Sequence, residues 1–129
     1  MQIREMEAQD ISALAEIEKK IFSQPWSAQA FADALSDPNA LFLVAAIEPD
    51  DQPCAYVGMY IAADEGEITN VATDPVFRRK GFAEALMARI KEIGLQKGLP
   101  GIYERETCLQ VNCLHSSPSR VLELAFLLF

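Results

Sequence analysis

Apolar residues recur with helical spacing in the first third of the chain. Residues 1–6 mix charged and apolar side chains and are expected to form a short strand. After them, an apolar residue returns every three or four positions, which predicts an amphipathic helix with Asp10 as its N-cap. The buried stripe of this helix is expected to consist of Ile11, Leu14, Ile17 and Ile21.

A second, shorter helix is predicted after a break at residues 25–27 (PWS). Ser27 can cap its first turn, because a serine side chain accepts a hydrogen bond from a free amide at a helix start. Phe31 and Leu35 are four residues apart and are expected to face the core. Residues 36–39 have the composition of a turn.

The middle of the chain has the pattern of three consecutive strands. They are expected at 40–48, 54–62 and 67–73, separated by a loop over 49–53 and a turn over 64–66. Such short connections join antiparallel neighbours. These residues therefore predict an antiparallel meander.

A longer helix is predicted from about 81 to 97, with a stop at Gly98. A strand at 108–112 is expected to lie parallel to its predecessor through this crossover helix, and 121–129 to form a short apolar helix or strand. The order predicts an α/β fold with a mixed (α+β) sheet, in a single domain over 1–129. The buried stripe of the long helix is expected to be Phe82, Leu86, Ile90 and Ile93.

Charge is distributed unevenly along the chain. The net charge is −8, yet residues 1–69 hold 13 acidic and 3 basic residues, whereas 70–129 hold 6 acidic and 8 basic residues. An acidic first half argues against a nucleic-acid partner and suits a cationic substrate, with solubility alone as the alternative explanation. We found no apolar run of the ~18 residues that a membrane span needs, so we expect a cytoplasmic protein without a membrane partner.

Cysteine and histidine give only weak evidence for a metal. Cys54, Cys108 and Cys113 are odd in number, and His115 is the single histidine. A zinc site is a weak alternative to reduced cysteines, so no metal is expected.

Three consecutive cations precede the long helix. Arg78, Arg79 and Lys80 are followed by Gly81, which lets a backbone approach a ligand closely. The first amides of the helix then face the same place. This arrangement predicts an anion site, with pyrophosphate as the natural anion.

Residues 68–75 (ITNVATDP), followed by Arg78-x-x-Gly81-x-Ala83, resemble the acetyl-CoA signature of the GNAT acetyltransferases. The resemblance implies acetyl-CoA as co-substrate, a strand whose backbone pairs with the pantetheine arm, and amides of about 79–84 around the pyrophosphate. The residues that it implies for this site are Val71, Ala72, Thr73, Arg78, Arg79, Lys80, Gly81, Phe82, Ala83 and Glu84.

Residues 21–27 (IFSQPWS), with Phe31 after them, resemble the loop between the first two helices of the RimI-type ribosomal-protein-alanine N-acetyltransferases. The resemblance implies an acceptor site at Phe22, Pro25 and Trp26. The alternative for Trp26 is a core aromatic at the helix junction, and both roles are compatible.

After about residue 100 the sequence departs from the RimI-type pattern. Gln110 aligns with the family's general base, Leu122 with its general acid, and His115 with an asparagine; neither an amide nor leucine can do the proton chemistry. The last two strands of the family pattern are missing from the sequence. A change of reading frame near 100–112 is the explanation we favour, with divergence as the alternative.

Three functions are compatible with these observations. The first is acetyl transfer to the N-terminal alanine of a ribosomal protein, and the second is acetyl transfer to a small amine. The third is an impaired acetyl-CoA-binding domain that forms a homodimer through 121–129. If there is catalysis, Glu67 is the carboxylate to test; the alternative is that Glu67 is simply an exposed glutamate at the end of a strand. An amide near Val71 is the expected oxyanion donor.

Overall fold

The order of elements follows the hydrophobic pattern. The computed structural model describes residues 1–104. Its strands and α-helices confirm the mixed α/β fold, with bounds within about two residues of those predicted up to α3. The elements are β1 (Gln2–Glu5), η1 (Ala8–Asp10), α1 (Ile11–Ile21), α2 (Ala28–Ser36), β2 (Ala40–Ile47), β3 (Gln52–Ala62), β4 (Glu65–Thr73), η2 (Pro75–Phe77), α3 (Phe82–Gln96) and β5 (Gly101–Glu104).

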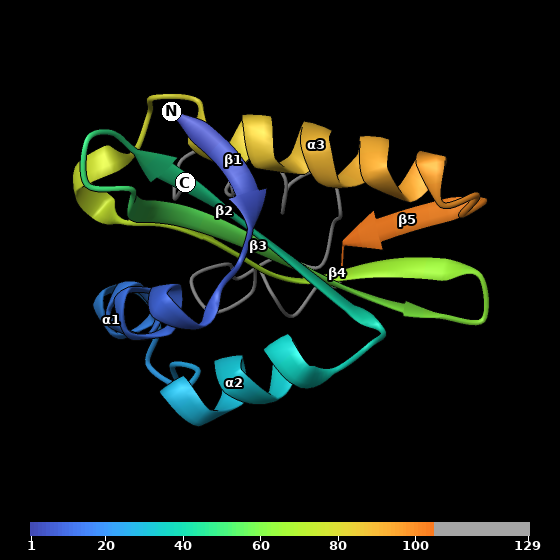
Figure 1. Ribbon diagram of the computed structural model, residues 1–129, viewed down its shortest axis with the longest axis horizontal. Coiled ribbons are helices and arrows are strands. Elements are labelled where there is room, and N and C mark those ends of the chain that lie inside the picture. The colour runs from blue at the N-terminus through green and yellow to red at the C-terminus, as the bar shows by residue number, and fades with distance from the viewer. Residues whose placement is uncertain (105–129) are drawn as a thin grey trace.

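The five strands form one sheet in the order β1-β2-β3-β4-β5. The pairs from β1 to β4 are antiparallel, as the short connections predict, and β5 runs parallel to β4 after the crossover through α3. Helix α3 covers one face of the sheet, and α1 and α2 cover the other (Figure 1). The parallel partner of β4 is thus at 101–104, so its predicted position was wrong. The strand predicted at 108–112 and the element at 121–129 lie outside the described residues.

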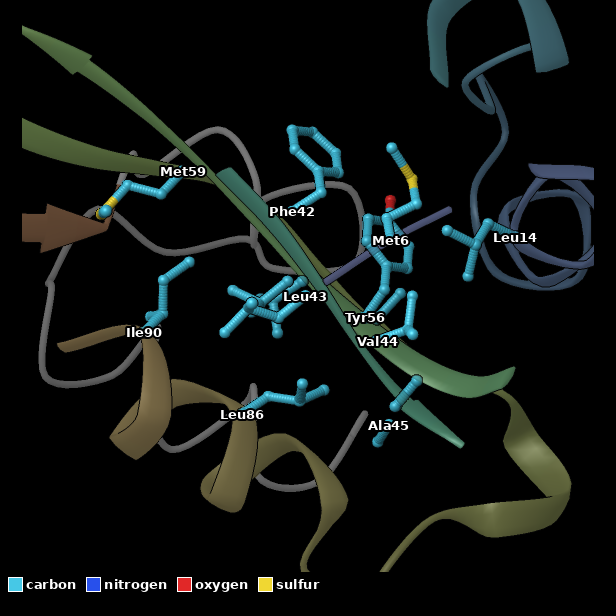
Figure 2. Packing of buried hydrophobic residues seen from close by; sticks show 14 of the residues in the cluster. Met6, Leu14, Phe42, Leu43, Val44, Ala45, Tyr56, Met59, Leu86 and Ile90 are labelled. Carbon is cyan, nitrogen blue, oxygen red and sulfur yellow. The ribbon is translucent and has the colours of Figure 1, made fainter. Parts of the chain in front are cut away.

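The core has a different composition on the two faces of the sheet. Under α3, the fully buried Leu86 and Ile90 point toward Leu43 of β2 (Figure 2). On the opposite face, Phe42 and Tyr56 lie beneath α1 and α2 and belong to an aromatic cluster. Burial of each such side chain contributes about 1.5–3 kcal/mol to folding.

The end of α3 confirms the predicted stop. Gly98 adopts φ +77°, its amide donates to the carbonyl of Leu95, and the amide of Leu99 donates to the carbonyl of Gly94, both at 3.0 Å. These are the two hydrogen bonds of a Schellman motif. Gly94 also packs against Ile102 so closely that a Cβ there would clash. The motif therefore turns the chain directly into β5.

Four predicted side-chain environments differ from the structure. Ile11 and Ile21, at the two ends of the predicted α1 stripe, are only half-buried. Leu35 is 43% exposed, because α2 has only nine residues and turns Phe31 and Ala34 toward the sheet instead. Ile93 is only half-buried, whereas the rest of the predicted α3 stripe is buried. Leu35 and Ile93 lie in the last turns of their helices.

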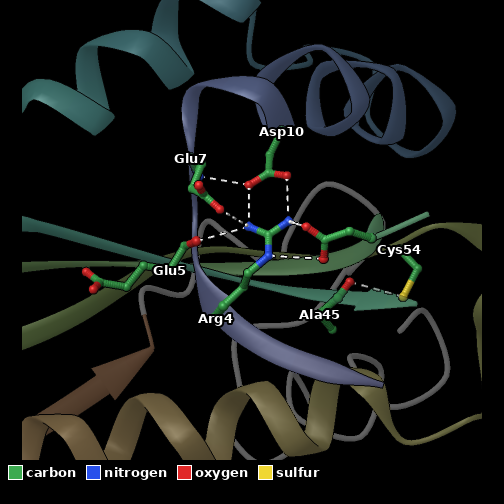
Figure 3. Close-up of polar contacts among 7 residues, drawn as sticks. Arg4, Glu5, Glu7, Asp10, Ala45 and Cys54 are labelled. Carbon is green, nitrogen blue, oxygen red and sulfur yellow. Dashed lines mark hydrogen bonds and ion pairs between the residues drawn. The ribbon is translucent and has the colours of Figure 1, made fainter. Parts of the chain in front are cut away.

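Asp10 does not cap α1 in the predicted way. Its carboxylate accepts the amide of Glu7 at 2.8 Å and both terminal nitrogens of Arg4 at 2.7 and 2.9 Å (Figure 3). Asp51 accepts further hydrogen bonds from the same guanidinium. The hydrogen bonding of the Arg4 guanidinium to the Asp10 carboxylate is the main reason that the pKa of Arg4 is raised. Asp10 thus joins β1 to the start of α1.

Candidate functional site

Strand β4 is paired unevenly along its two edges. It pairs with β3 over its whole length but with β5 only over Glu65–Ile68. Within residues 1–104, the β5-side edge of 69–73 has no strand partner. The register with β3 also skips Thr69, which is a β-bulge. The candidate residues Val71, Ala72 and Thr73 lie on this stretch of β4, which pairs with one strand only among the described residues.

The connection from β4 to α3 is built from capped turns. Asp74 Oδ1 accepts the amide of Val76 at 3.1 Å, which fixes η2 at the end of the strand. Arg79 then adopts φ +65° and Gly81 φ +83°. A positive φ is uncommon outside glycine and costs about 1–3 kcal/mol, so the loop holds Arg79 in an unfavourable conformation beside the candidate site.

The start of α3 meets the requirements of an anion site. Ala85 is the first residue whose amide bonds back within the helix, to the carbonyl of Gly81, so helix geometry leaves the amides of Phe82, Ala83 and Glu84 without partners inside the helix. A Cβ at Gly81 would meet nothing within 4 Å, so the space above the loop is open.

The cations of this loop differ in their surroundings. Arg79 and Lys80 are exposed, and Lys80 Nζ lies 5.7 Å from the centre of the Phe77 ring. Nε of Arg78 is buried and has no hydrogen-bond partner among the described residues. An unpaired buried N–H, free amides and a helix N-terminus together fit a pyrophosphate.

The loop between α1 and α2 carries the predicted acceptor residues. Trp26 is half-buried, with ring centroids 5.2 Å from Phe31 and 5.7 Å from Phe42. Phe22 is half-buried and Pro25 is exposed. The structure thus shows the core role of Trp26 and leaves an exposed loop surface beside it.

Glu67 lies on the same face of the sheet as this loop. It is half-buried and directly opposite Tyr60, which places the two side chains on one face. The Tyr60 ring contacts Phe42, a member of the aromatic cluster, with centroids 5.9 Å apart. Burial first, and then the carboxylates of Asp37 and Asp33, raise the pKa of Tyr60. This face is therefore acidic around its aromatic residues.

One buried carboxylate was not identified from the sequence. Glu18 is 2% exposed, and its oxygens accept the amide of Trp26 at 2.9 Å and the hydroxyl of Tyr56 at 2.5 Å. Burial raises the pKa of Glu18, and the two hydrogen bonds oppose this rise. Its position four residues after Leu14, within the apolar stripe of α1, is the signal that could have revealed it.

Several sequence predictions fall beyond the described residues. Gln110, Leu122, His115, Cys108 and Cys113 all lie there. Among residues 1–104, no group of three or more His, Cys, Asp or Glu side chains could hold a metal ion. Cys54 is a free, buried cysteine whose pKa burial raises to about 11. In the same part of the chain, no helix has the length and apolar character needed to cross a membrane.

Comparison with known proteins identifies the family. The model of the acetyltransferase (GNAT) family matches residues 11–112, and the chain belongs to this family. A Bacillus subtilis protein provisionally named ribosomal protein bS18-alanine N-acetyltransferase is 34% identical over 96 residues. That match covers 74% of this chain and 62% of the relative, so the matched segment spans less than two thirds of the relative's length.

Solved structures share the fold. The ribosomal-protein-S18-alanine N-acetyltransferase of Escherichia coli superposes with a TM-score of 0.76 at 21% identity, over 96% of this chain and 73% of that one. The PaiA N-acetyltransferase of Thermoplasma acidophilum, solved in complex with coenzyme A, gives 0.65 at 19% identity, over 76% of this chain and 74% of that one. At these identities the likeness concerns the fold alone.

Proposed function

We propose that this chain transfers the acetyl group of acetyl-CoA to a primary amine. Two features, joined by the short connection over 74–81, carry the proposal: the edge of β4 after Ile68, which has no β5 partner within residues 1–104, and the start of α3 after Gly81, which has no side-chain cap. A free strand edge can hydrogen-bond the amides of a pantetheine arm, and free helix amides can bind its pyrophosphate. Membership of the GNAT family agrees with this use of both features.

The cofactor residues would then divide into two groups. Val71, Ala72 and Thr73 would offer backbone groups to the pantetheine arm, and residues 78–84 would hold the pyrophosphate. Because the second group acts largely through amides, the conformation of the loop matters more than most of its side chains. Arg78 is the exception, since its buried Nε has no partner within residues 1–104.

The proposed acceptor is the α-amino group of an N-terminal alanine on a ribosomal protein, which places the reaction in the cytoplasm. The loop of Pro25 and Trp26 borders the face that carries Glu67, and the carboxylates of Asp33 and Asp37 act on Tyr60 of that face. A cationic segment, as ribosomal proteins offer, would be attracted to these carboxylates. The name of the Bacillus subtilis relative supports this acceptor.

The chemistry requires two protons to leave the acceptor ammonium group. The base removes the first, the neutral amine attacks the thioester carbonyl, a C–N bond forms, the nitrogen releases its second proton to solvent, the C–S bond breaks, and the thiolate takes a proton from solvent. An α-amino group has a pKa of about 7.7–8.0, so a modest base is sufficient. Glu67 is the proposed base, acting directly or through water, and an amide near Val71 would stabilise the oxyanion.

Binding of acetyl-CoA without turnover is the second candidate. It is favoured by Gln110 and Leu122, which align with the family's base and acid and cannot do their chemistry. Transfer to a small amine is a further variant of the first proposal. Thiol release separates these candidates: no acceptor stimulates it in a domain that only binds acetyl-CoA, whereas a small amine stimulates it in a small-amine enzyme.

Thiol release from acetyl-CoA tests the proposal. The full chain is assayed with a basic peptide that begins with alanine, with the same peptide blocked at its N-terminus, and with a small polyamine. Release that depends on the free α-amino group supports the proposal, whereas release with the polyamine alone supports a small-amine enzyme. Binding of acetyl-CoA without any release would contradict acetyl transfer.

A further inference from the structure

Glu18 is a buried charged group that the proposed chemistry does not use. It lies near the end of α1, and its two oxygens serve two different parts of the molecule. Oε1 accepts the backbone amide of Trp26 from the loop, and Oε2 accepts the hydroxyl of Tyr56 from β3. A buried charge is costly unless it is fully hydrogen-bonded, so this position is a poor choice for packing alone.

The hydrogen bonds continue from Tyr56 to the bulge of β4. Tyr56 is fully buried, and its hydroxyl accepts Nδ2 of Asn70 at 3.4 Å. Oδ1 of Asn70 in turn accepts the hydroxyl of Thr69, the residue that the bulge leaves unpaired, at 2.7 Å. Val71 follows Asn70 directly in the sequence. A continuous set of side chains therefore joins the α1–α2 loop to the strand segment beside the proposed thioester site.

We propose that Glu18 is a positioning residue, which fixes the Trp26 loop relative to the β4 bulge and so sets the place of the acceptor amine. The effect of Glu18 on acceptor kinetics rests on the proposed function, whereas its role in fixing the Trp26 loop does not. Both Glu18 and Tyr56 are too deeply buried to touch a substrate, so their effect passes through the loop. The consequence is an effect on acceptor binding and not on acetyl-CoA binding.

Asp10 offers a matched control on the same side of the sheet. Like Glu18, it is a carboxylate that is 2% exposed and accepts one backbone amide and one donor side chain, here both terminal nitrogens of Arg4. It lies at the start of α1, whereas Glu18 lies near its end. Asp10→Asn therefore perturbs a similar buried network without touching the Trp26 loop, and Glu18→Gln perturbs the loop.

Two readouts separate positioning from a general loss of stability. Trp26 is the single tryptophan of the chain, so acrylamide quenching of its fluorescence reports on this loop alone. We expect Glu18→Gln to increase the quenching and to raise the KM for the alanine peptide roughly ten-fold, because an uncharged amide offers only one acceptor oxygen to the two donors and binds them more weakly. The KM for acetyl-CoA is expected to stay within about two-fold.

The comparison with Asp10→Asn decides the outcome. Quenching and peptide KM that are equal in Glu18→Gln and Asp10→Asn would overturn the inference, and Glu18→Leu provides the same test if the glutamine variant is poorly folded. If the wild-type chain acetylates no peptide, the proposed function fails by itself. Quenching then still decides the role of Glu18: an increase specific to Glu18 variants supports it, and no increase rejects it.

Discussion

The two faces of the sheet perform different tasks with different side chains. Under α3, aliphatic residues such as Leu43, Leu86 and Ile90 are buried, and the proposed site at the start of α3 would rely mainly on backbone amides. On the other face, aromatic rings surround the hydrogen-bonded Glu18 and Tyr56. If the proposed function is correct, function on the α3 side would depend on backbone conformation, whereas function on the α1–α2 side would depend on side-chain identity.

The largest expected effects come from removing one core residue on each face. Phe31→Ala should cost about 3–5 kcal/mol and Leu86→Ala about 2–5 kcal/mol, because each leaves a cavity at a fully buried position. Only Phe31→Ala should also change Trp26 fluorescence, since these two rings are in contact. Urea unfolding followed by circular dichroism, with fluorescence recorded in parallel, measures both. Equal changes in Trp26 emission would show that the faces are not separate.

Two glycines at opposite ends of α3 test the role of the backbone. Gly81 and Gly98 both have positive φ and open space where a Cβ would lie, so alanine at either position should cost about 1–2 kcal/mol through strain alone. Only Gly81→Ala should weaken acetyl-CoA binding, by roughly ten-fold or more, because its Cβ would lie against the bound phosphate. Calorimetric titration of both variants checks this, and equal affinities would argue against the site.

The pH dependence of stability tests the buried carboxylate of the other face. Burial raises the pKa of Glu18 above its ordinary value of 4.5. As pH rises, the Glu18 carboxyl therefore loses its proton in the unfolded chain before it does so in the folded protein. Between the pKa of the unfolded chain and that of the folded protein, the folded state binds more protons. The free energy of unfolding falls through that window.

Glu18→Gln removes this contribution. The stability of wild type minus that of Glu18→Gln should therefore be larger at about pH 4 than at about pH 7, in urea unfolding at a series of pH values. A difference that grows with pH would mean that folding lowers the pKa of Glu18 instead.

The smallest expected effect concerns a surface ion pair that connects the two sides. Lys20 of α1 lies 2.9 Å from Asp74, in the connection between β4 and α3, and half of the lysine side chain is exposed. Lys20→Met should cost no more than about 1 kcal/mol, because exposed ion pairs are screened by solvent. A thermal melt measures the cost. A loss of several kcal/mol would show that this contact holds the two sides together.

Local signals predicted most of the fold. The spacing of apolar residues located α1 and α3, Ser27 and Gly98 marked a helix start and a helix end through their capping chemistry, and short turns predicted the antiparallel strands. Strand β5 was misplaced, because the four residues at 101–104 hold too short an apolar run to signal a strand. Its position depends on the contact of Gly94 with Ile102, which is a tertiary effect.

The candidate site was predicted only in part, because some of its residues are brought together by folding and not by local sequence. The motif at 78–83 located the start of α3, since glycine and clustered cations act locally. Glu18 could not be separated from the neighbouring charged residues of α1 by composition, because its partners Tyr56 and Trp26 are brought to it by folding. Likewise, the register of β5 against Glu65–Ile68 of β4 is set by folding and not by the local sequence.

The most direct test is to follow the backbone amide signals of the full chain by NMR during titration with acetyl-CoA. The account predicts that the amides of residues 71–73 and 81–84 shift, while those of 65–67, which pair with β5, and of Gly98 change little. Shifts centred on the Trp26 loop, or none around Gly81 at saturating acetyl-CoA, would contradict the placement of the cofactor between β4 and the start of α3.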